Sequence, residues 1–163
     1  MKTITKISDH DIEEIVTFLN TLLADEYALY TKTRNAHWNI NGPKFNELLN
    51  FFEDQYLSLD VIIDDIAERV RSLGHFALGS LKIFLSVTHI GEENHDFSNP
   101  KQIIQSLASD HETIISIILV NINPISDNYK DPDITDFVTG LMQQHGKMAS
   151  MLRTFLSKLN TYN

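Results

Sequence analysis

The sequence contains no cysteine, only four prolines and six glycines, and a single tryptophan in 163 residues. Without cysteine, the chain cannot form a disulfide framework, a zinc ribbon or a cysteine nucleophile. Low-complexity runs are also absent, and 42% of the residues are hydrophobic, which excludes disorder as a description of the whole chain. A chain of this length can bury a sizeable core, and we expect one domain over residues 1–163.

Positive charge is scarce, with 13 lysines and arginines against 22 aspartates and glutamates, a net charge of −9. This balance argues against a protein that binds nucleic acid by neutralising phosphates. No run of consecutive apolar residues approaches the roughly 18 that a membrane span needs. The segment 1–6 lacks the apolar core of a signal peptide, so we expect a cytoplasmic protein without a membrane partner.

Helical periodicity dominates the sequence, because apolar residues recur at steps of three and four. The spacing predicts long helices over about 9–37, 43–73, 100–124 and 131–159, and a short helix within 78–87. Four long helices with a long connection between the second and third are typical of an all-α four-helix bundle with a crossover, the ferritin-like topology. Residues that commonly start or stop helices flank these segments: Ser8 or Asp9, Pro43, Gly74, Pro124 and Asp131.

The second helix carries acidic residues along one face. At 100° per residue, Glu53, Asp60, Asp64 and Glu68 lie within about 80° of one another. A core face is formed by Phe52, Ile63, Ile66 and Val70, while further apolar residues, Phe51, Leu57, Val61 and Ile62, lie elsewhere on the wheel. A helix that is apolar on more than one side is buried on more than one side, which indicates an interface with a second copy of the chain.

The acidic stripe alone is compatible with an ordinary solvated helix face. A functional interpretation needs a partner of another type, and His37 at the end of the first helix is the candidate. Carboxylates with an imidazole suit iron, manganese or zinc, and a bound cation relieves the repulsion between neighbouring carboxylates. The adjacent Trp38 either packs in the core or lies near such a site, and spacing alone does not separate these alternatives.

Two blocks resemble the Dps family, the mini-ferritins named as DNA-binding proteins from starved cells. The first is His-Trp-Asn-Ile-Asn-Gly-Pro-Lys-Phe at 37–45, and the second is Asp-Asp-Ile-Ala-Glu-Arg at 64–69. The resemblance continues through Leu-Gly at 73–74 and Gly-Ser-Leu-Lys-Ile-Phe-Leu at 79–85, and length and helix layout agree over nearly the whole chain.

The resemblance implies a hollow shell of twelve subunits that oxidises Fe(II), usually with hydrogen peroxide, stores the ferric product and protects against oxidative damage. It implies a site between two subunits, with His37 and Glu53 from one and Asp64 and Glu68 from the other, all four acting as metal ligands and catalytic residues. Glu53 stands where the family usually has aspartate. The acids Asp133 and Asp136 match family positions that line pores for Fe(II).

The main departure from the family is Leu49, which stands where a second histidine is usual. Leucine cannot coordinate a metal, so we expect one iron to bind well, a second weakly and oxidation to be slow. The alternatives are a shell that binds metal with little ferroxidase activity, or a structural protein without an iron role. The family's DNA-binding members commonly carry a lysine-rich tail, but this chain has only Lys158 in its last seven residues, so we expect no direct DNA binding.

Overall fold

A computed structural model of the chain describes residues 7–42, 44–129 and 131–161. Its helices are α1 (Asp9–Asn39), α2 (Phe45–Ser72), α3 (Leu81–Val87), α4 (Pro100–Pro124) and α5 (Pro132–Thr161), and a π-helical segment, η1 (Ile125–Tyr129), follows α4. The predicted all-α fold is confirmed, with four long helices and a short helix between the second and third.

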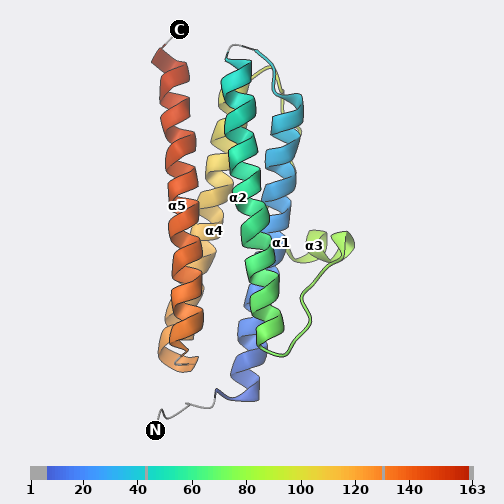
Figure 1. Cartoon of the computed structure of the whole chain (residues 1–163), viewed down its shortest axis with the longest axis vertical. Coiled ribbons are helices and arrows are strands. Elements are labelled where there is room, and N and C mark those ends of the chain that lie inside the picture. Colours follow the sequence, from blue (N-terminus) through green and yellow to red (C-terminus); the bar gives the residue numbers. More distant parts are fainter. Residues whose placement is uncertain (1–6, 43, 130, 162–163) are drawn as a thin grey trace.

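The four long helices lie side by side as two hairpins (Figure 1). In one hairpin α1 packs on α2, in the other α4 packs on α5, and α1 also contacts α4. The connection from α2 to α4 runs the length of the bundle and carries α3, which packs on α1. The core consists of aliphatic and aromatic side chains that all four helices supply, among them Leu19, Leu29, Phe52, Ile62, Ile104, Ile114, Val138 and Leu141.

Helix ends follow local side-chain chemistry, with one correction to the prediction. Ser8 Oγ accepts the backbone N–H of Asp11 at the start of α1, and Gly74 has a φ of 87° just beyond the end of α2. The prediction of Pro43 as the first residue of the second helix is wrong: α2 begins at Phe45, after Lys44 in the left-handed region, and Pro43 lies outside the described residues.

The prediction that Pro124 closes the third helix is confirmed, because α4 ends at this residue. The helical winding continues beyond it as η1. Proline cannot donate a backbone hydrogen bond to the preceding turn and its ring crowds that turn, and the chain here widens into a π-helical turn instead of unwinding. Asp131 then caps α5 as predicted, because its Oδ1 accepts the N–H groups of Asp133 and Ile134, each at 3.0 Å.

The segment Pro100–Asn128 is long and apolar enough to cross a membrane by length and composition alone, with a mean hydropathy of 1.3. Its apolar residues are interrupted by polar ones, which is why no long consecutive run stands out in the sequence. In the bundle α4 packs against α5 and α1, and its inward residues Ile104, Ile114 and Ile118 are fully buried. The helix is therefore a core helix.

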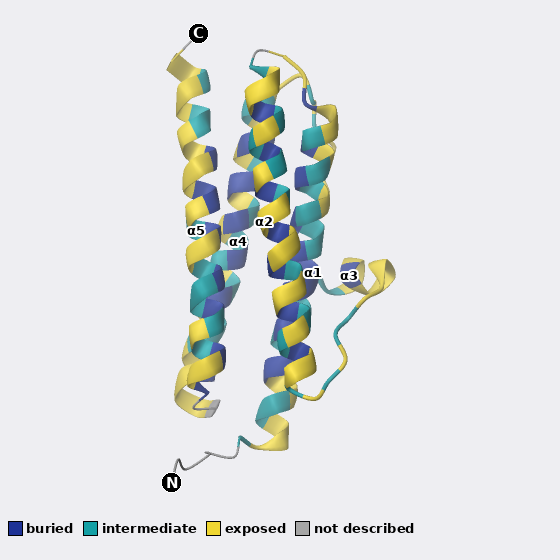
Figure 2. Ribbon diagram, viewed as in Figure 1, coloured by how far each residue is buried: buried dark blue, intermediate teal, exposed yellow. Residues whose placement is uncertain are grey.

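Part of the second apolar side of α2 is explained within the chain. Ile62 is fully buried, and the ring of Phe51 packs on Phe155 of α5 with centroids 5.1 Å apart. Leu57 and Val61, by contrast, remain 51% and 60% exposed. Exposed residues run along the outer side of α2 and over much of α3, which lies at the side of the four long helices (Figure 2). Within the described part of the single chain, no other helix buries the side chains of Leu57 and Val61.

Candidate metal site

His37 lies in the last turn of α1, where the chain turns back toward α2. Its Nδ1 is 2.9 Å from the carbonyl oxygen of Leu49. Because a carbonyl oxygen only accepts hydrogen bonds, Nδ1 must carry the proton and donate it. In the neutral ring the lone pair then lies on Nε2, the arrangement of a metal-binding imidazole that is held by its other nitrogen.

Tyr56 of α2 contacts both His37 of α1 and Glu53 of α2. The His37 and Tyr56 rings meet edge to face, with centroids 5.3 Å apart and planes at 74°. The Tyr56 hydroxyl lies 3.5 Å from Glu53 Oε1. His37, Glu53 and Tyr56 are each half-buried, so this cluster is accessible from outside the chain. Tyr56 therefore links two of the predicted site residues, His37 and Glu53, within a single copy.

An arginine lies next to this cluster. The Arg34 guanidinium donates to the Tyr30 hydroxyl at 2.6 Å, and the hydrogen bond raises the pKa of Arg34. Its central carbon also lies 4.8 Å from the centre of the Tyr56 ring and 5.1 Å from that of Trp38. Trp38 is 64% exposed, so the interpretation of Trp38 as a core residue is wrong. It lies at the edge of the His37 cluster.

Asp64 and Glu68 form the other half of the predicted site. They lie one turn apart on α2, and both are exposed. Among the described residues neither has a hydrogen-bond or ion-pair partner. Asp60, one turn before Asp64, is exposed as well. The acidic stripe predicted from the helical wheel thus faces outward.

The two halves do not meet within one chain. His37 contacts the Leu49 and Tyr56 level of α2, and Asp64 lies eight residues beyond Tyr56. At 1.5 Å per residue the separation is about 12 Å along the helix axis, and about 18 Å for Glu68. Accordingly, no group of three or more His, Asp or Glu side chains suited to a metal occurs within the described ranges. A site that combines these residues requires two copies.

The predicted pore residues lie at the start of α5. Asp133 and Asp136 are both exposed in its first two turns, next to the capping Asp131. Asp131 is occupied by its backbone hydrogen bonds, whereas the two outer acids face away from the core. Their placement permits a role at a junction between copies.

A buried polar chain lies in the centre of the bundle and was largely missed in the sequence. Glu26 Oε1 accepts from His145 Nε2 at 2.7 Å, and His145 Nδ1 is 2.9 Å from His111 Nδ1. All three side chains are almost fully buried, as the sequence predicted for His111. His145 and Glu26 could have been found because they follow the same helical spacing as the apolar core residues around them.

Asp25, next to Glu26, is also fully buried and was missed. Its carboxylate accepts from the Thr88 hydroxyl at 2.7 Å and from the backbone N–H of His89 at 2.5 Å, and Oδ2 lies 3.0 Å from His89 Nδ1. These bonds tie the end of α3 to the middle of α1. Asp25 thus holds the long connection in place.

A second tie joins α1 to α4. Lys32 Nζ lies 2.6 Å from Asp110 Oδ2 and donates to the Gly91 carbonyl at 2.9 Å. Desolvation by burial raises the pKa of Asp110, and Lys32 opposes that rise. The pair therefore fixes α1 against both α4 and the long connection.

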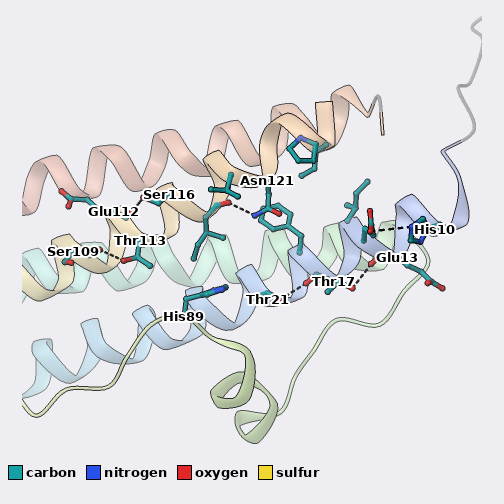
Figure 3. A pocket seen from close by; sticks show the side chains of 17 residues that line it. His10, Glu13, Thr17, Thr21, His89, Ser109, Glu112, Thr113, Ser116 and Asn121 are labelled. Atoms are coloured by element: carbon teal, nitrogen blue, oxygen red, sulfur yellow. Dashed lines mark hydrogen bonds and ion pairs between the residues drawn. The ribbon is translucent and has the colours of Figure 1, made fainter. Parts of the chain in front are cut away.

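A groove of about 1180 Å³ lies elsewhere, between α1 and α4. Figure 3 shows polar side chains from both helices along it, including His10, Thr17, Thr113 and Asn121. None of the predicted site residues lines this groove. The candidate site is thus an exposed surface cluster on α1 and α2 and does not coincide with the groove.

Comparison with known proteins gives the family. The ferritin-like domain model matches residues 16–162. An uncharacterized low temperature-induced protein of Nostoc sp. is 36% identical over 150 residues, which cover 92% of this chain and 84% of that protein. DNA protection during starvation protein 2 of Bacillus anthracis is 30% identical over 146 residues, which cover 90% of this chain and 99% of that protein.

Among solved structures, the crystal structure of a Dps protein from Bacillus brevis superimposes with a TM-score of 0.84 at 27% identity. The match covers 91% of this chain and 99% of that one. The chain belongs to the Dps family of ferritin-like proteins.

Proposed function

We propose that this protein binds Fe(II) between two copies of the chain, oxidises it with hydrogen peroxide or oxygen, and stores the ferric product in a hollow shell of twelve copies. One copy supplies His37 and Glu53, and its neighbour supplies Asp64 and Glu68. The observation that carries this proposal is the hydrogen bond from His37 Nδ1 to the Leu49 carbonyl, which leaves Nε2 free to bind a metal.

The chemistry of the donor set supports ferrous iron as the substrate. Neutral imidazole and carboxylate are ligands that suit divalent iron. Asp64 and Glu68 have no partner among the described side chains, and a cation would offset the repulsion between them. The exposed Leu57 and Val61 lie on the same helix and would be covered by the neighbour that completes the site.

Leu49 limits the proposed chemistry. Its side chain is half-buried beside His37 and offers no donor atom. A second ferrous ion would then depend on Glu53 and a shared Glu68, so we expect it to bind weakly and oxidation to be slow for the family. Leu49 also favours the second candidate function, a metal-binding shell with little ferroxidase activity.

Two further roles belong to the proposal. Asp133 and Asp136 would line the entry of Fe(II) into the shell, since both are exposed at the start of α5. The removal of ferrous iron and peroxide would protect the cell from oxidative damage during starvation. We place this activity in the cytoplasm and expect no direct contact with DNA, because the net charge of −9 opposes a polyanion.

The test is an anaerobic Fe(II) titration of the assembled protein, followed by peroxide and measurement of ferric absorbance. His37→Ala should lose the tight ferrous site and most of the ferric signal. His10→Ala, an exposed histidine at the other end of α1, is the matched control and should retain both. Equal ferrous affinity in wild type and His37→Ala would contradict the proposal, and tight binding without peroxide-dependent oxidation would favour the second candidate.

A further inference from the structure

A row of aromatic rings leads away from His37. The Tyr56 ring meets the His37 ring at 5.3 Å between centroids. Tyr30 on α1 lies edge to face on Tyr56 at 6.1 Å, and Tyr27 lies 5.9 Å from Tyr30. Three of the five tyrosines in the chain thus form a continuous series that begins at the proposed iron ligand.

Arg34 holds this series in a fixed geometry. It donates to the Tyr30 hydroxyl and lies over both the Tyr30 and Tyr56 rings, at 5.5 and 4.8 Å. Tyr56 and Tyr30 are half-buried, and the Tyr56 hydroxyl lies 3.5 Å from Glu53 Oε1. The tyrosine next to His37 therefore has a carboxylate beside its phenolic proton.

With only one tightly bound ferrous ion, the proposed reaction lacks one of the two electrons that peroxide needs. Hydrogen peroxide needs two electrons to become water, and each ferrous ion gives one. Leu49 provides no ligand for a second ferrous ion beside the first. A single ferrous ion would convert peroxide to hydroxide and a hydroxyl radical, unless a nearby group gives the second electron.

We propose, on the basis of the function proposed above, that Tyr56 is a redox-active residue that supplies this second electron. The ferrous ion gives one electron and becomes ferric. Tyr56 gives one electron and its phenolic proton, which leaves through Glu53. Peroxide takes both electrons, the phenolic proton and one proton from solvent, and becomes two waters. The product on the protein is a neutral phenoxyl radical on Tyr56, and Tyr30 and Tyr27 extend the path along α1.

Tyr56 fits this role better than Trp38. Among the described residues Trp38 has no hydrogen bond to a carboxylate, and its ring lies against the Arg34 guanidinium. It is also 64% exposed, so an oxidised indole there would meet solvent. Tyr56 instead contacts both proposed ligands of the same copy, His37 by its ring and Glu53 by its hydroxyl.

The experiment uses the assembled full-length protein, loaded anaerobically with Fe(II), mixed with hydrogen peroxide and freeze-quenched for electron paramagnetic resonance. Wild type should give a phenoxyl radical and should consume fewer than two ferrous ions per peroxide. Tyr56→Phe should lose the radical and release hydroxyl radical to a spin trap. Trp38→Phe and Tyr162→Phe, which replace an oxidisable indole or phenol by a phenyl ring, are controls and should keep the wild-type signal.

Protein grown on ring-deuterated tyrosine provides a readout without any substitution, because the hyperfine structure of a tyrosyl signal must narrow. An unchanged signal in that protein or in Tyr56→Phe would overturn the inference. Two ferrous ions oxidised per peroxide without a radical would also overturn it, while leaving the proposed iron oxidation intact. If wild type oxidises no ferrous ion at all, both proposals fail.

Discussion

At the scale of single residues, the site depends on how backbone and side chain act together at Leu49. The carbonyl of this residue orients His37, whereas its side chain removes a ligand. The carbonyl would be present whatever the residue at 49, so the orientation of His37 should survive substitution. The position can therefore be tested without disturbing its neighbour.

Leu49→His should add a second imidazole beside His37 and create a second tight ferrous position. We expect the number of tightly bound Fe(II) per site to rise from about one to about two, with faster oxidation, since two ions can together deliver both electrons to peroxide. Anaerobic calorimetry measures the stoichiometry. Leu49→Gln, which has no imidazole, is the control, and an equal stoichiometry in all three proteins would count against our interpretation of Leu49.

His111 should make stability depend on pH. Burial, together with the neighbouring His145, lowers the pKa of His111 well below its ordinary value of 6.5. As the pH falls below 6.5, His111 therefore takes up a proton in the unfolded chain but stays neutral in the folded chain. The free energy of unfolding should fall with pH in that range, by up to about 1.4 kcal/mol per pH unit for one such group.

The variant His111→Asn keeps a side-chain N–H donor toward His145 and cannot titrate. Its free energy of unfolding should change less with pH than that of wild type between about pH 7 and pH 5. Urea denaturation at one protein concentration measures this, because subunit association also contributes to stability. The same pH dependence in both proteins would show that His111 is not the titrating group.

At the scale of helices, the sequence predicted the elements well and their ends less well. Long amphipathic periods identify helices because the apolar spacing must match the helical turn wherever one face is buried. The start of α2 was misplaced because Lys44 takes a left-handed conformation, so the helix begins only at Phe45. Tertiary packing determines which helix faces are buried. Periodicity alone therefore could not show that Ile62 and Phe51 pack within the chain whereas Leu57 and Val61 stay exposed.

The outer face of α2 yields a prediction about assembly. Val61 is 60% exposed, and Leu57 one turn before it is 51% exposed. Val61→Lys would place a charge where a neighbouring copy is expected, and burial of an unpaired charge is costly. Analytical ultracentrifugation should show a shift toward smaller species, while Ser150→Lys on the exposed side of α5 should assemble as wild type. An unaltered assembly of Val61→Lys would place the interface elsewhere.

At the scale of the whole molecule, the negative net charge leads us to expect no binding to DNA. A shell of about twelve copies, each with a net charge of −9, would repel a polyanion at neutral pH. Gel-shift experiments at moderate salt and without divalent ions should therefore show no retardation of duplex DNA. Retardation under those conditions would contradict the expectation and would point to a basic surface that the net charge conceals.

The limits of sequence reasoning are also clearest at this scale. The motif resemblance predicted His37 from one copy and Asp64 with Glu68 from the other. It did not give their separation within one chain: Asp64 and Glu68 lie about 12 and 18 Å along α2 from Tyr56, which His37 contacts. Burial of His111 was predicted from its place in an apolar stripe, whereas Glu26 and His145 were missed although they follow the same helical spacing. The contacts that join these three side chains, by contrast, follow only from the packing of α1, α4 and α5.

The most direct test of the central claim mixes two inactive variants, His37→Ala and Glu68→Ala. Each alone should lack the tight ferrous site. If the two halves come from different copies across a two-fold interface, each mixed pair contains one intact site and one doubly altered site. Random co-assembly after joint refolding should then restore about a quarter of the wild-type sites. The predicted result is tight Fe(II) binding at about a quarter of the wild-type stoichiometry. If verified mixed assemblies regain no tight binding, the site does not combine residues of two copies in this way.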